Sequence, residues 1–122
     1  MHDAVIVGAG PGGSATGHFL SSRGLDVGLL DRADFPRDKT CGDGLTPRAL
    51  RVLDQMGLLA DVARRGCAIE AYEVVAPNGR ATRAPITATP GATVIRRRVL
   101  DDLILHRAIA SGATFEPKVT VT

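Results

Sequence analysis

The chain has 122 residues, of which 44% are apolar and 23% charged, and its formal net charge is +2 at pH 7. These values predict one globular domain with a core, and the 3% aromatic content is too low for a surface that stacks single-stranded nucleic acid. Cys41 and Cys67 fit neither a disulfide scaffold nor a zinc site. Because no signal peptide and no apolar run of membrane-spanning length is present, the sequence predicts a cytoplasmic protein.

The first thirty residues predict a strand, a helix and a second strand. An apolar run at residues 4–7 is typical of a buried parallel strand. The glycine-rich segment 8–13 follows, and then a helix over about residues 14–23. A second apolar run at residues 27–30 predicts the next buried strand. The pattern predicts a strand–helix–strand unit over residues 3–31, and therefore an α/β fold with a parallel sheet.

The rest of the chain predicts further helices and strands. Residues 32–66 are expected to form a loop and then two helices, the first of which begins at Thr46. Alternating apolar residues around an Asn-Gly turn predict a β-hairpin over residues 68–88, and a helix followed by a strand is expected over residues 98–122. That sheet would be short of strands, so we expect residues 1–122 to be the N-terminal part of a larger domain.

The segment GAGPGG at residues 8–13 fits the Gly-x-Gly-x-x-Gly fingerprint of dinucleotide-binding folds. The alternative is that these glycines only turn the chain. A strand before the segment, a helix after it and Asp31 at the end of the next strand together favour dinucleotide binding. Gly8 would permit the tight turn, Gly10 the approach of the pyrophosphate, and Gly13 close helix–strand packing. The expected cofactor-binding residues of this segment are Gly8, Gly10, Pro11, Gly12, Gly13 and Ser14.

The acidic residue at the end of the second strand indicates which dinucleotides fit. Asp31 is expected to accept hydrogen bonds from the ribose hydroxyls, with Arg32 next to it in the cofactor site. A carboxylate at this place argues against a 2′-phosphorylated dinucleotide. FAD and NAD both remain open on the basis of these residues, since both use this fold.

Residues 35–48 read FPRDKTCGDGLTPR. Together with GAGPGGSATG near the N-terminus, this segment resembles the geranylgeranyl reductase family of FAD-dependent oxidoreductases, which includes menaquinone side-chain reductases and archaeal lipid reductases. The similarity extends over essentially the whole chain. The residues that match further elements of the family are Cys41, Gly42 and Gly44 in a Cys-Gly-x-Gly element, and Arg97, Leu100 and Asp101 in a later one.

The resemblance implies a Rossmann-like FAD-binding domain of the p-hydroxybenzoate hydroxylase or glutathione reductase type, here incomplete, with FAD held along the sheet. The family's later Gly-Asp element and its substrate domain are not among these residues. By resemblance, five residues belong to the FAD site: Cys41, Gly42 and Gly44 against the cofactor, Arg97 in contact with it, and Val121 near the adenine.

The local sequence also bears on the assignments of Arg97 and Cys41. Arg97 stands among three arginines at the start of a predicted helix, where the helix dipole disfavours cations, so an anionic partner such as a pyrophosphate is expected. Its neighbours Arg96 and Arg98 are interpreted as solvated. The alternative for Cys41 is a small buried apolar residue.

By resemblance, the function is the reduction of isoprenoid double bonds in a lipid or quinone side chain. The implied partners are a small-molecule or lipid substrate and an electron donor such as NAD(P)H or a reduced protein carrier, with peripheral membrane association and no nucleic acid. The alternatives are a flavin-dependent monooxygenase or halogenase of the same fold, and a truncated FAD-binding fragment without activity. No metal site and no catalytic residue is assigned.

Overall fold

The structure is a computed structural model that describes all of residues 1–122. The chain forms two compact units. The first unit consists of Met1–Cys41 and Arg96–Thr122, and the second unit consists of Gly42–Ile95.

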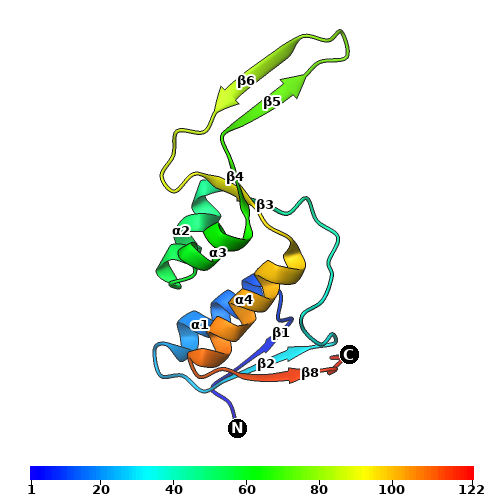
Figure 1. Cartoon of the computed structure of the whole chain (residues 1–122). Coiled ribbons are helices and arrows are strands. Elements are labelled where there is room, and N and C mark those ends of the chain that lie inside the picture. Colours follow the sequence, from blue (N-terminus) through cyan, green and yellow to red (C-terminus); the bar gives the residue numbers. More distant parts are fainter. The chain divides into compact units, whose positions relative to one another are not determined.

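The first unit is a parallel sheet with two helices (Figure 1). Its three strands stand in the order β1-β2-β8 and all pairs are parallel, with Ala4 opposite Val27 and Gly28 opposite Thr114. This arrangement confirms the expected α/β class. The elements are β1 (Ala4–Val7), α1 (Pro11–Ser21), β2 (Val27–Asp31), α4 (Arg97–Ala110) and β8 (Thr114–Pro117).

The core of the first unit lies between the sheet and its helices. Val27 and Leu29 of β2 are fully buried and pack with Leu105 and Ala108 of α4. Helix α1 approaches α4 closely at Gly17, where an added Cβ would lie 3.8 Å from the Cβ of Ala108. Small residues at this contact let both helices pack against the sheet, which buries the apolar residues that drive folding.

The last strand is shorter than the sequence predicted. Strand β8 ends at Pro117, which lies opposite Asp31 and has no N–H with which to continue the ladder. Lys118 then adopts a positive φ of 62°, and the Val119 amide donates a 3.0 Å hydrogen bond to the Asp31 carbonyl. The chain therefore turns after Pro117 and does not extend as a strand to Thr122.

The second unit combines two helices with short antiparallel strands. Helix α2 begins at Thr46, whose hydroxyl accepts a 3.3 Å hydrogen bond from the Ala49 amide, as the sequence predicted. One sheet has the order β3-β7-β4, and strands β5 and β6 form a separate hairpin. The elements are β3 (Gly44–Leu45), α2 (Pro47–Gln55), α3 (Leu59–Arg65), β4 (Cys67–Ile69), β5 (Ala71–Val75), β6 (Ala81–Pro85) and β7 (Ala92–Val94).

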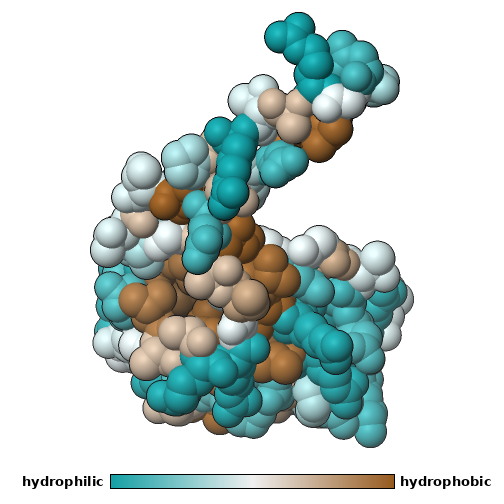
Figure 2. Space-filling view, turned by 45° about the horizontal axis from the view of Figure 1, so that its top comes forward, coloured by the Kyte–Doolittle hydropathy of each residue, from teal (hydrophilic) through white to brown (hydrophobic).

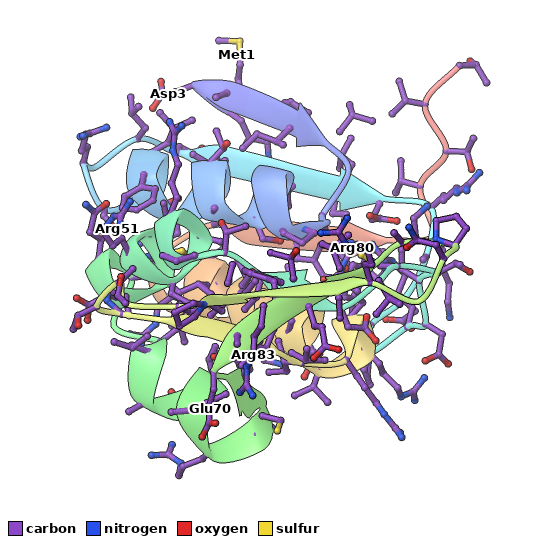
Figure 3. All side chains as sticks on the ribbon, turned by 90° about the horizontal axis from the view of Figure 1, so that it is seen from above. Met1, Asp3, Arg51, Glu70, Arg80 and Arg83 are labelled. Atoms are coloured by element: carbon purple, nitrogen blue, oxygen red, sulfur yellow. The ribbon has the colours of Figure 1, made fainter.

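The β5–β6 hairpin is exposed on both faces. Tyr72 and Val74 are 49% and 71% exposed, and apolar and polar surfaces lie next to one another on this hairpin (Figure 2). Glu70, Arg80 and Arg83, labelled in Figure 3, are exposed as well. None of the helices of the chain is both long enough and apolar enough to span a membrane.

The core of the first unit yields a stability prediction. Leu105 is 1% exposed, so Leu105→Ala should lower the free energy of unfolding by about 2–5 kcal/mol through lost burial and the cavity left behind. Ile109, on the same helix, is 40% exposed, and Ile109→Ala should cost clearly less. Urea unfolding of both variants measures the difference. Equal losses would contradict the placement of Leu105 in the core.

Candidate functional site

A pocket of about 640 Å³ lies in the first unit, where β1 and β2 end. The carboxyl ends of parallel strands are the usual place for a ligand in an α/β fold. All of its lining residues belong to the first unit. They are Val7, Gly8, Gly10, Asp31, Arg32, Ala33, Arg37, Asp38, Lys39, Val119, Thr120 and Val121.

The glycine-rich turn at this pocket depends on the absence of side chains. Gly8 has a φ of 102°, a left-handed conformation that glycine adopts without strain. A Cβ on Gly13 would lie only 1.8 Å from the Gly8 carbonyl oxygen, so the turn and the helix can pack together only if residue 13 is glycine. Gly10 is different, because a Cβ there would meet only Nη2 of Arg37, at 3.7 Å. The space in front of Gly10 is therefore open to a ligand.

The start of helix α1 offers donors for an anion. The helix begins at Pro11, with Gly10 as its N-cap and no side chain capping it. The amides of Gly12 and Gly13 belong to the first turn, where no preceding helical carbonyl is available to them. The first turn contains no acidic residue. This positive end of the helix dipole is suited to binding phosphate.

Asp31 has a structural role that the sequence did not reveal. Its Oδ2 accepts a 2.7 Å hydrogen bond from the Ala9 amide, and its Oδ1 accepts a 2.8 Å hydrogen bond from the Ala33 amide. The carboxylate thus ties the glycine-rich turn to the segment after β2. Asp31 is half-buried and lines the pocket, and a carboxylate has room for further donors beyond these two.

The pocket brings together part of the predicted cofactor residues. Ser14 is fully buried, and its hydroxyl donates a 2.8 Å hydrogen bond to the Ala9 carbonyl. This bond stabilises the glycine-rich turn. Gly42 and Gly44 belong to the second unit, where Gly44 opens β3 and pairs with Val94. The predicted residues that line the pocket are Gly8, Gly10, Asp31, Arg32 and Val121.

Arg97 lies at the start of α4 and is engaged by the protein itself. Its Nε and Nη2 donate hydrogen bonds of 2.7 Å and 2.9 Å to the two carboxylate oxygens of Asp101, and its guanidinium also interacts with the Cys41 thiol. The hydrogen bonds to Asp101 raise the pKa of Arg97 above its ordinary value, so the guanidinium stays charged. Asp101 supplies the anionic partner that the sequence led us to expect from a cofactor. Arg97 and Cys41 are not among the residues that line the pocket.

Seven lining residues are not among the site residues that the sequence predicted. Val7 and Ala33 directly adjoin predicted residues. Three more stand in the segment FPRDKTCGDGLTPR, which carries the family resemblance. No sequence signal distinguished Val119 and Thr120, because the turn after Pro117 brings the end of the chain to the pocket. The seven residues are Val7, Ala33, Arg37, Asp38, Lys39, Val119 and Thr120.

All of residues 1–122 match the family described as FAD binding domain. The chain belongs to this family of FAD-binding domains. Among curated proteins, it is 44% identical to the menaquinone reductase of Mycobacterium tuberculosis over 91% of the chain and 28% of the relative. It is 32% identical to digeranylgeranylglycerophospholipid reductase 1 of Methanopyrus kandleri over 93% of the chain and 29% of the relative. The chain thus spans less than a third of the length of these relatives.

Solved structures share the fold. A flavin-dependent brominase matches with a TM-score of 0.84 and 29% identity, over 94% of this chain and 29% of its own. A geranylgeranyl bacteriochlorophyll reductase-like protein from Thermoplasma acidophilum matches with a TM-score of 0.82 and 21% identity, over 96% of this chain and 30% of its own. These comparisons confirm three predictions from the sequence: the resemblance to geranylgeranyl and menaquinone reductases, the FAD-binding α/β fold and FAD as the cofactor.

The fit of the glycine-rich turn can be tested with two neighbouring glycines. Gly13→Ala places a Cβ against the Gly8 carbonyl, so it should destabilise the domain by about 1–3 kcal/mol and reduce FAD retention. A Cβ on Gly12 meets nothing within 4 Å, so Gly12→Ala should leave stability nearly unchanged. Thermal unfolding and flavin absorbance of the purified proteins give both readouts. A Gly13→Ala variant as stable as the parent would show that the turn is not packed as described.

Proposed function

We propose that the full-length protein is an FAD-dependent oxidoreductase that reduces isoprenoid double bonds in a lipid or quinone side chain. The observation that carries this proposal is the 44% identity to a menaquinone reductase over 91% of the chain. The identity of 32% to a digeranylgeranylglycerophospholipid reductase supports the same class of substrate. When bound, FAD supplies the redox chemistry, while the protein supplies binding and orientation.

The proposed role of this chain is to hold the adenosine and pyrophosphate parts of FAD. The glycine-rich turn from Gly8 to Ser14 and the first amides of α1 form the phosphate-binding end of the pocket. Asp31 and Arg32 would bind the ribose, and Val121 would lie near the adenine. The remaining proposed contacts, carried over by the resemblance, are those of Cys41, Gly42, Gly44 and Arg97.

The proposal includes the partners of the enzyme. A small-molecule or lipid substrate and an electron donor, either NAD(P)H or a reduced protein carrier, are required by a reductase of this kind. The protein would act in the cytoplasm and meet a lipid substrate at the membrane surface.

A second candidate function is oxygenation or halogenation. It is favoured by the flavin-dependent brominase, whose structure superposes with a TM-score of 0.84 at 29% identity. The segment FPRDKTCGDGLTPR and the greater identity to the menaquinone reductase favour reduction over this alternative. A third candidate is a fragment that binds FAD without turnover.

The assignment of Asp31 to the ribose predicts a selective loss of affinity. Asp31→Ala in the full-length protein should weaken FAD binding by about 1–3 kcal/mol, because a hydrogen-bonding partner is lost and polar groups are left unpaired. FMN lacks the adenosine, so its affinity should fall less than that of FAD, and only by the part that comes from the lost hydrogen bond to the turn at Ala9. Asp34 is exposed and lies three residues further along, so Asp34→Ala serves as the matched control. Titration of the apoprotein with both flavins measures the effect, and unchanged FAD affinity in Asp31→Ala would remove Asp31 from the site.

The reaction class is tested by the dependence on oxygen. Full-length protein with reduced flavin is incubated with a geranylgeranylated lipid or a menaquinone, once without oxygen and once with it. A reductase should add two hydrogen atoms per saturated double bond without oxygen, which mass spectrometry detects. If product forms only with oxygen and carries an added oxygen or halogen atom, the second candidate function holds instead.

A further inference from the structure

Asp101 is the one charged residue among the buried polar side chains of the chain. It lies in α4 with a fully buried carboxylate, and burying a carboxylate without a partner is very costly. Two arginines from different segments compensate it. Arg97, one turn earlier in α4, binds both oxygens, and Nη1 of Arg37, from the segment after β2, lies 3.1 Å from Oδ2.

The guanidinium of Arg37 connects this buried carboxylate to the pocket. On one side, its Nη1 forms the ion pair with Asp101. On another side, Nη2 is the only neighbour that a Cβ on Gly10 would meet, at 3.7 Å. The guanidinium carbon lies 4.7 Å from the centre of the Phe35 ring, which packs in turn against Phe115. The ion pair and the contact with the Phe35 ring therefore hold an arginine next to Gly10, the N-cap of α1.

The charges indicate that Arg37 does more than neutralise Asp101. Arg97 already pairs with the carboxylate through two hydrogen bonds, so the second arginine leaves the cluster with one excess positive charge. Nη1 of Arg37 faces Asp101, whereas Nη2 lies on the side of Gly10. An arginine held in this way next to open helix amides is suited to binding a phosphate group.

We propose that Asp101 is a positioning residue that holds the Arg37 guanidinium beside Gly10, where Arg37 binds a phosphate group of the cofactor. Asp101 does not line the pocket and acts through Arg37, which does. This inference rests on the proposed binding of the FAD pyrophosphate at the start of α1. It adds an arginine from the segment after β2 to the glycines and helix amides as a phosphate ligand.

A positioning role of Asp101 predicts that Asp101→Asn changes the affinity for phosphate in the direction opposite to that expected from charge alone. Removing the carboxylate in Asp101→Asn makes the cluster more positive, so simple attraction would strengthen phosphate binding. If Asp101 positions Arg37, Asp101→Asn should instead weaken phosphate binding. The test compares apoprotein of the full-length parent with Asp101→Asn, Arg37→Gln and the double variant, titrated calorimetrically with FAD, ADP and adenosine.

Both single variants should lose affinity for FAD and ADP by about 10- to 100-fold, the size expected for losing a hydrogen bond to a charged group. Affinity for adenosine, which has no phosphate, should stay within about threefold of the parent's value, because neither substitution changes the shape of the adenosine site. The double variant should bind ADP about as weakly as Arg37→Gln, because a residue that acts through Arg37 adds nothing once Arg37 is gone.

Two matched controls lie in the same unit. Asp102 is next to Asp101 but faces His106, and Asp102→Asn should bind ADP like the parent. Arg23 is exposed beyond the C-terminal end of α1, and Arg23→Gln should do the same. If Asp101→Asn does not fold, Asp101→Glu keeps the charge but displaces the carboxylate by one methylene, and the same selective loss of ADP over adenosine is expected.

The outcomes separate this inference from the proposed function. A parent protein that binds no FAD contradicts the proposed function and the inference with it. A parent that binds FAD while a folded Arg37→Gln keeps full ADP affinity overturns the inference alone. Tighter ADP binding by Asp101→Asn, or an equal loss of ADP and adenosine, also overturns it, since the first indicates charge alone and the second a purely structural role.

Discussion

The close approach between Gly13 and the Gly8 carbonyl is the constraint on which the site depends. It brings the start of α1 against the end of β1, at a distance that excludes even a methyl group. The helix amides and the positive end of the helix dipole consequently lie at the carboxyl ends of the strands. At Gly10, in contrast, an added Cβ would meet only Nη2 of Arg37, at 3.7 Å. The same turn is therefore tightly packed at Gly13 and open at Gly10, where we propose that a phosphate binds.

Two carboxylates hold the groups around this turn in place. Asp31 accepts hydrogen bonds from the backbone amides of Ala9 and Ala33. The buried Asp101 pairs with Arg97 and Arg37. The donors that face the ligand are therefore fixed before any ligand arrives. Preorganisation of this kind lowers the cost of ordering side chains on binding.

Much of the first unit could be predicted from the sequence, because local patterns determine it. An apolar run, a glycine fingerprint and an acidic residue after the next strand define the strand–helix–strand unit and the place of the pocket. The end of β8 was predicted less well, because only its pairing partner shows that Pro117 interrupts the ladder. Strand β7 was not predicted, because it has only three residues and an alternating pattern cannot be recognised over so short a segment.

The Arg37–Asp101 pair could not be predicted from the residues for a different reason. In α4, Asp101 is followed directly by Asp102, and nothing in the local sequence shows that Asp101 is the one that is fully buried. Its partner stands in an irregular segment far away along the chain. Such a pair becomes visible only in three dimensions, whereas the hydrogen bond from Thr46 to its own helix follows from local sequence alone.

The double attachment of Asp31 limits how the nucleotide preference of this fold can be redesigned. In dinucleotide-binding folds, this acidic position is the obvious one to exchange when a phosphorylated ribose is to be accepted. Here the same carboxylate accepts hydrogen bonds from the amides of Ala9 and Ala33, so its replacement also removes an anchor of the turn that carries the proposed phosphate-binding glycines. A redesign that keeps Asp31 and alters its exposed neighbour Arg32 would change the surroundings of the proposed ribose site without this loss. The anchoring of the turn therefore restricts which single substitutions can lead to a different cofactor.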